Sequence, residues 1–118
     1  MGYHGILIRE GIKDQKILKQ MKLLGNKFSD NDNFTLLRVG VDEKSIDKVV
    51  KLIQHNLFPK YYAHFYKRNE LIVIFPKKII RMTTSKKTWN EAVEYGKSVG
   101  IPAEQLDFFP CRVEDETY

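Results

Sequence analysis

The sequence has very little cysteine and no long hydrophobic run, and these shortages exclude whole classes of protein. Cys111 is its only cysteine, so an intramolecular disulfide is impossible and a cytoplasmic location is the expectation. No run of about 18 apolar residues occurs, so no membrane-spanning helix is expected. The apolar stretch at residues 6–8 is too short for the hydrophobic region of a signal peptide, so none is expected.

The motifs that mark common catalytic and metal sites are also missing. Neither GxxxxGK[ST] nor GxGxxG occurs, so no phosphate-binding loop of these kinds is predicted. The histidines His4, His55 and His64 do not have HxH or HxxxH spacing, and there is no CxxC pair. Because a metal site needs several convergent ligands, no metal ion and no cofactor are predicted. Nothing in the spacing of titratable residues defines a catalytic set.

Charge, in contrast, is abundant and unevenly distributed. The chain of 118 residues has a formal net charge of +5, and residues 60–87 hold eight basic side chains against the single carboxylate of Glu70. After Lys87 the balance is acidic. This asymmetry permits polyanion binding or head-to-tail self-association. The length is usual for one domain, and we expect a single α+β domain over residues 1–110 with a frayed acidic C-terminal tail at 111–118.

Hydrophobic spacing and turn residues define the expected elements. For the helix at 13–28, Ile17, Met21, Leu24 and Phe28 recur on one helical face. Trp89 is expected in the core, on the buried face of the last helix. Strands are predicted over residues 3–9, 34–41, 61–67, 71–75 and 79–83, helices over 13–28, 43–57 and 88–99, and a polar loop over 29–33.

The resulting order is β-α-β-α-β-β-β-α. Residues 61–83 are predicted to form an antiparallel three-strand meander, because short polar connections separate its strands. Each helix has one apolar stripe, which needs a sheet to pack on. We therefore expect a two-layer α+β sandwich with the helices packed on one face of the sheet.

The segment HFYKRNELIVIFPKKIIRMTTSKKTWNEAVEYGKSVGIPAEQLDFFP, residues 64–110, resembles small prokaryotic α+β proteins known chiefly as uncharacterised sequences. The resemblance covers the C-terminal half of the chain. It implies a compact α+β domain, and it brings no assigned activity and no site residues.

Strand alternation divides the meander into two faces. Tyr61, Ala63 and Phe65 form the more apolar face, which we expect to meet the helices. The opposite face is then expected to be open, with arginines from neighbouring strands beside its rings. The predicted platform of rings and cations consists of Tyr62, His64, Tyr66, Arg81 and Arg38.

Such a platform favours a non-catalytic binding or assembly module. Two copies could bury their open faces against one another, and this self-association is favoured slightly over nucleic-acid binding, in which bases stack on the rings and phosphates meet the cations. An alternative is a small enzyme that acts on an anionic metabolite held by Arg38, His64 and Arg81. No membrane partner is expected.

Overall fold

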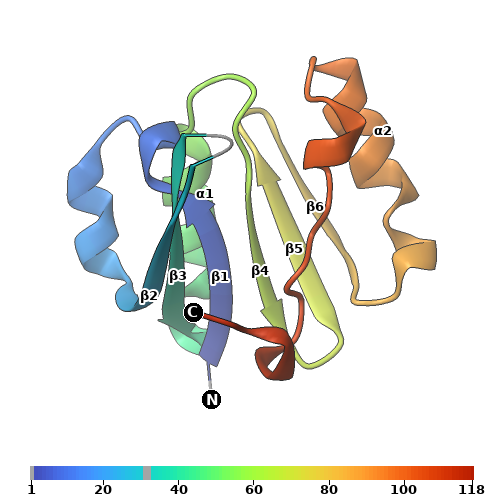
Figure 1. The fold of residues 1–118 in the computed structure, drawn as a ribbon. Helices are drawn as coiled ribbons and strands as arrows, with labels where there is room; N and C mark the ends of the chain where they lie inside the picture. Colours follow the sequence, from blue (N-terminus) through green and yellow to red (C-terminus); the bar gives the residue numbers. More distant parts are fainter. Residues whose placement is uncertain (1, 31–32) are drawn as a thin grey trace.

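A computed structural model describes residues 2–30 and 33–118 and shows an α+β fold built on one open antiparallel sheet (Figure 1). The strand order in the sheet is β2-β3-β1-β4-β5-β6. The strands are β1 (Gly2–Ile8), β2 (Lys22–Ser29), β3 (Phe34–Asp42), β4 (Ala63–Lys67), β5 (Glu70–Phe75) and β6 (Lys78–Thr83), and the helices are α1 (Ile46–His55) and α2 (Asn90–Ser98).

The predicted helix at 13–28 is wrong. Its first half forms a 3-10 helix, Gln15–Gln20, and its second half is the edge strand β2. Ile17 and Met21 are buried as the helical pattern required, but Phe28 is exposed. Gly25 and Asn26 favour a helix poorly, and pairing with β3 satisfies the backbone instead. The predicted loop at 29–33 includes residues 31 and 32, which lie outside the described part of the chain.

One face of the sheet packs against α1, which lies behind the sheet in Figure 1. Ile46, Val49, Val50 and Ile53 form the buried stripe of α1, as the predicted amphipathic helix at 43–57 requires. Alternate residues of the strands meet this stripe, and they include Leu7, Leu37, Val39, Phe65, Ile72 and Ile74. We call this side of the sheet the helix face.

The opposite side of the sheet is covered as well. Residues of α2 and of the chain after it form a second apolar cluster there, which includes Ile6, Tyr66, Val73, Phe75, Trp89, Ala92, Leu106 and Phe108. The expectation that all helices pack on one face is therefore wrong. The physical reason lies in β5, whose residues Leu71–Phe75 are apolar at every position and bury both of their faces. Trp89 is buried, as predicted.

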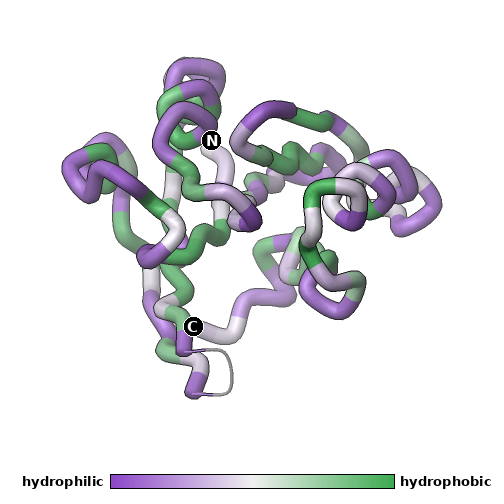
Figure 2. The backbone as a smooth tube through the Cα atoms, turned by 90° about the horizontal axis from the view of Figure 1, so that it is seen from above, coloured by the Kyte–Doolittle hydropathy of each residue, from purple (hydrophilic) through white to green (hydrophobic). Residues whose placement is uncertain are grey.

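The chain beyond α2 returns across the front of the sheet (Figure 1). We call residues 103–118 the C-terminal segment. Two 3-10 turns, Ala103–Gln105 and Val113–Asp115, are its regular structure. In Figure 2 the end of this segment is a largely hydrophilic tube that approaches the opposite half of the molecule from α2. In the described ranges, no helix has the length and apolar character needed to cross a bilayer.

Candidate functional site

The face that carries Tyr62, His64 and Tyr66 lies under the C-terminal segment. The side chains of His64 and Tyr66 are buried, with 3% and 1% of their surface exposed. Phe108, from the segment, packs edge-on against Tyr62 with ring centroids 5.5 Å apart. The prediction that this face is open is therefore wrong. Neither stacked bases nor a second copy can reach Tyr66 while the segment is in place.

The structure also divides the five predicted binding residues. Arg38 lies on the same face as His64 and Tyr66, where it contacts the C-terminal segment. Arg81 lies opposite Ile72 in the β5–β6 register and so belongs to the helix face. Its guanidinium Nη2 is 2.8 Å from Oδ1 of Asp47 on α1. The anion-holding set of Arg38, His64 and Arg81 is consequently not assembled.

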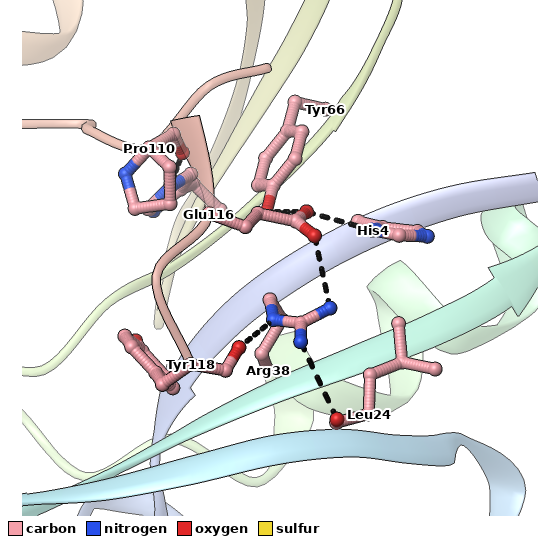
Figure 3. A network of polar contacts seen from close by, with 8 residues as sticks. His4, Leu24, Arg38, Tyr66, Pro110, Glu116 and Tyr118 are labelled. Carbon is pink, nitrogen blue, oxygen red and sulfur yellow. Dashed lines mark hydrogen bonds and ion pairs between the residues drawn. The ribbon is translucent and has the colours of Figure 1, made fainter. Parts of the chain in front are cut away.

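Glu116 anchors the C-terminal segment to the sheet. Its Oε2 accepts a hydrogen bond from the Tyr66 hydroxyl at 2.5 Å and lies 2.7 Å from Nδ1 of His4. Its Oε1 accepts from Nη1 of Arg38 at 2.9 Å. Figure 3 shows the carboxylate between these three side chains, which come from β1, β3 and β4. The expectation of a frayed tail is therefore wrong at Glu116.

Arg38 is held further by main-chain oxygens. Its Nε donates to the main-chain oxygen of Tyr118, and its Nη2 donates to the carbonyl of Leu24 at 3.4 Å. Burial, followed by the hydrogen bond to Glu116 and its charge, raises the pKa of Tyr66. Tyr66 therefore remains a protonated donor to the carboxylate. Together these contacts commit Arg38 to the fold, because its charge is already matched by Glu116.

Beside this network lies a half-open pocket of about 930 Å³. It runs between β1 and β3 on one side and the C-terminal segment on the other. Much of its wall is apolar or aromatic, and it includes Leu36, Phe34, Tyr61, Tyr62 and Phe109. Phe34 and Tyr61 meet edge-on, with ring centroids 5.8 Å apart. A pocket of this size and character suits a small organic molecule.

His64 supplies the pocket with a hydrogen-bond acceptor. Its Nε2 lies 2.9 Å from the carbonyl oxygen of Pro110 and so must carry the proton. Burial lowers the pKa of His64 to about 4, against smaller opposing effects of the Pro110 carbonyl and the Asp107 charge. The ring is therefore neutral near pH 7, and its Nδ1 carries a lone pair.

The lone pair belongs to a residue that lines the pocket. Nδ1 of His64 has no hydrogen-bond partner among the described residues. Among the same residues, every completely buried side-chain nitrogen or oxygen has a partner. Nδ1 is consequently not completely buried, and the pocket is the cavity that His64 lines.

Tyr62 contributes its ring more than its hydroxyl. The hydroxyl donates to the main-chain carbonyl of Gln105 and lies 3.5 Å from that of Asp107. Burial, followed by the nearby charge of Asp107, raises the pKa of Tyr62, so the phenol keeps its proton. The hydroxyl thus ties the C-terminal segment to the start of β4.

The charged groups of the pocket are few and mostly acidic. Asp115 is neutralised by Arg112, whose Nε and Nη2 each lie 3.0 Å from a carboxylate oxygen. Within the described residues, Lys60, Glu104 and Asp107 have no ion-pair partner. The unpaired carboxylates therefore outnumber the single ammonium. Over residues 2–30 and 33–118, no group of three His, Cys, Asp or Glu side chains is arranged to hold a metal ion.

Sequence reasoning placed His64 and Tyr62 on one face but missed Glu116 and the pocket. Strand alternation revealed the shared face, since side chains two residues apart in a strand point the same way. No local pattern marks Glu116, because its three partners are at least 50 residues distant in the sequence. Comparisons of the chain with family models, with curated proteins and with solved structures find no match.

Proposed function

We propose that this protein is a non-catalytic binding module that takes a flat small molecule into the pocket beneath its C-terminal segment. The observation that carries the proposal is the partnerless Nδ1 of His64 among aromatic walls. His64 is only 3% exposed, so Nδ1 gains little hydration, and a ligand N–H or O–H would supply the hydrogen bond that it lacks. The proposed site includes Tyr62 and His64 of the predicted platform, but it is a pocket beneath the C-terminal segment and not an open sheet face.

Binding is favoured over catalysis because of the proton affinities in the pocket. A general acid or base works best when its pKa lies near the operating pH. The pKa of His64 is lowered to about 4, whereas that of Tyr62 is raised by burial. Near neutral pH both groups therefore hold a fixed protonation state, which suits recognition of a ligand better than proton transfer.

The lining also indicates the chemistry of the ligand. The rings of Phe34, Tyr61 and Phe109 favour a flat, apolar body. The lone pair of His64 calls for a hydrogen-bond donor. Because Glu104 and Asp107 outweigh Lys60, an uncharged or cationic molecule is favoured over an anion. An anionic metabolite is disfavoured, because Arg38, its natural anchor, is already paired with Glu116.

Two probes of the same shape and opposite charge test the proposal. Benzamidine is flat, cationic and rich in N–H donors, whereas benzoate has the same ring with a carboxylate. A ligand that binds only the folded protein raises its Tm as its concentration exceeds the Kd. We expect benzamidine, at millimolar concentration, to raise the Tm and to shift the NMR signals of the His64 ring, and benzoate to do neither.

Variants of exposed residues that line the pocket test whether benzamidine binds there. Phe109→Ala removes an exposed ring, and Asp107→Asn removes a carboxylate at the rim. Each is expected to weaken benzamidine binding at least about threefold. Glu94→Gln is the matched control, since Glu94 is an exposed carboxylate on α2 outside the pocket. Equal binding of both probes, or no binding of benzamidine, or binding that neither variant weakens, would overturn the proposal.

A further inference from the structure

The strand β2 forms one edge of the sheet, and its outer side pairs with no strand of the described chain. An exposed edge presents unpaired N–H and C=O groups, and another strand can pair with them. Two large apolar side chains lie on this edge, Leu23 with 54% and Phe28 with 53% of their surface exposed. Exposed apolar side chains at an unpaired edge are stabilised when an added strand buries them from water.

A bulge brings these two side chains to the same face of the sheet. Residues five apart in a regular strand point to opposite faces. The register of β2 with β3, however, shifts between Leu23 and Gly25. Leu23 consequently lies opposite Val39, and Phe28 lies opposite Thr35. Since Val39 and Thr35 are four residues apart in β3, Leu23 and Phe28 both point to the helix face.

This arrangement makes β2 complementary to a second copy of itself. In an antiparallel pair related by a two-fold axis through Asn26, with Leu24 of each strand as the extra residue of the bulge, Leu23 of each copy lies opposite Phe28 of the other. Apolar pairs across strands are favourable, and the symmetry supplies the pair twice. The Lys22 end of one strand then adjoins the Asp30 end of the other, which offsets the charge of Lys22.

The other edge of the sheet is unsuited to the same pairing. β6 carries the exposed charged side chains of Lys78 and Arg81, which form ion pairs with Glu91 and Asp47. β2 carries exposed lysines as well, but β6 has no exposed large apolar side chain comparable to Leu23 and Phe28. A contact of β2 with β6 would repeat from molecule to molecule, whereas a contact of β2 with β2 closes after two copies.

From these observations we infer that β2 is a homodimer interface, where two chains join their sheets edge to edge through Leu23 and Phe28. The interface lies apart from the ligand pocket, so dimer formation and benzamidine binding are separable. It also differs from the surface expected from the sequence, where Tyr66 was to mediate self-association. Tyr66 is now assigned to the anchoring of Glu116.

Sedimentation equilibrium of the full chain measures the association. We expect a monomer–dimer equilibrium that persists at high salt, since apolar contacts carry it. Phe28→Lys is expected to raise the dimer Kd at least about tenfold, because it sets a charge against Leu23 of the second copy. Val99→Lys is the matched control, since Val99 is an exposed apolar residue at the end of α2. Its Kd is expected to stay unchanged.

Cysteine cross-linking tests the register. In the inferred pair, position 23 of one copy meets position 28 of the other, whereas the two copies of position 28 are roughly 13 Å apart along the strands, four ladder steps at about 3.3 Å each. A disulfide needs Cα atoms within about 7 Å of each other. A mixture of Leu23→Cys and Phe28→Cys chains should therefore cross-link under mild oxidation, and neither chain alone should do so. The native Cys111 is buried, so the unaltered chain serves as the control.

Three results would overturn the inference. The first is a strictly monomeric mass at every concentration up to the solubility limit. The second is a dimer whose Kd is the same with Phe28→Lys as with Val99→Lys. The third is cross-linking of either single-cysteine chain alone as efficiently as the mixture, because this would require a different register.

Discussion

The two faces of the sheet are covered in different ways. On the helix face, the apolar stripe of α1 packs against apolar side chains at alternate positions of the strands. On the other face, α2 shares the cover with the C-terminal segment, which has only short turns and is attached near its end by the carboxylate of Glu116. Apolar packing holds α1 on the sheet, whereas the C-terminal segment is held in part by the ion pair and hydrogen bonds of Glu116.

This difference explains where the candidate site lies. A regular helix repeats its contacts along its length and leaves little space at the sheet. An irregular segment contacts the sheet at separate points, such as Phe108 and Glu116, and the pocket opens between the segment and the strands. The acceptor Nδ1 of His64 lies on this face without a hydrogen-bond partner among the described residues.

The largest effect is expected on the helix face. Phe65 is completely buried there, and Phe65→Ala should reduce the free energy of unfolding by about 3–5 kcal/mol, since it leaves a cavity. Phe109→Ala on the opposite side removes a ring that is 57% exposed and should cost less than about 0.5 kcal/mol. Urea denaturation measures both. A cost below about 1 kcal/mol for Phe65→Ala would show that the helix face is not tightly packed.

An intermediate effect is expected from pH, through His64. Its pKa is about 4 in the folded protein against an ordinary value of 6.5, so the unfolded chain binds the proton more tightly. The contribution of neutral His64 to stability is therefore complete above pH 6.5 and is lost as the pH falls to about 4. The loss is on the order of 3 kcal/mol.

Urea denaturation across this pH range tests the effect. His64→Gln has no titrating ring, so its stability should depend less on pH than that of the unaltered protein between pH 4 and 6.5. The difference between the two curves isolates His64 from the other titrating groups. Parallel curves would show that His64 is not held neutral beneath the segment.

The smallest effect of the three is expected at the anchor. Glu116→Gln keeps the shape of the side chain but removes the charge that Arg38 needs, and it should cost about 2 kcal/mol. Amide hydrogen exchange should accelerate in the C-terminal segment while α1 keeps its protection. Glu114→Gln is the control, because the Glu114 side chain is 69% exposed. If both variants exchange alike, the anchor does not hold the segment.

The sequence predicted much of the sheet and little of the site. The helix at 43–57, the strand at 71–75 and the core position of Trp89 were recognisable because each depends on neighbours in the chain. The strand β2 was mistaken for a helix, because its apolar spacing matched a helical face. Arg81 was assigned to the wrong face. The turn between β5 and β6 sets their register, and the amino-acid sequence did not reveal the geometry of that turn.

The sequence by itself determined the fold class, the amphipathic character of α1 and the shared face of Tyr62, His64 and Tyr66, since these follow from periodicities of two and of 3.6 residues. Only the tertiary structure decided what covers that face. The contacts that decide it join Glu116 to His4 and Arg38 across most of the chain, and no local pattern encodes such a contact. Burial of the covered face then set the pKa of His64, and with it the chemistry of the pocket.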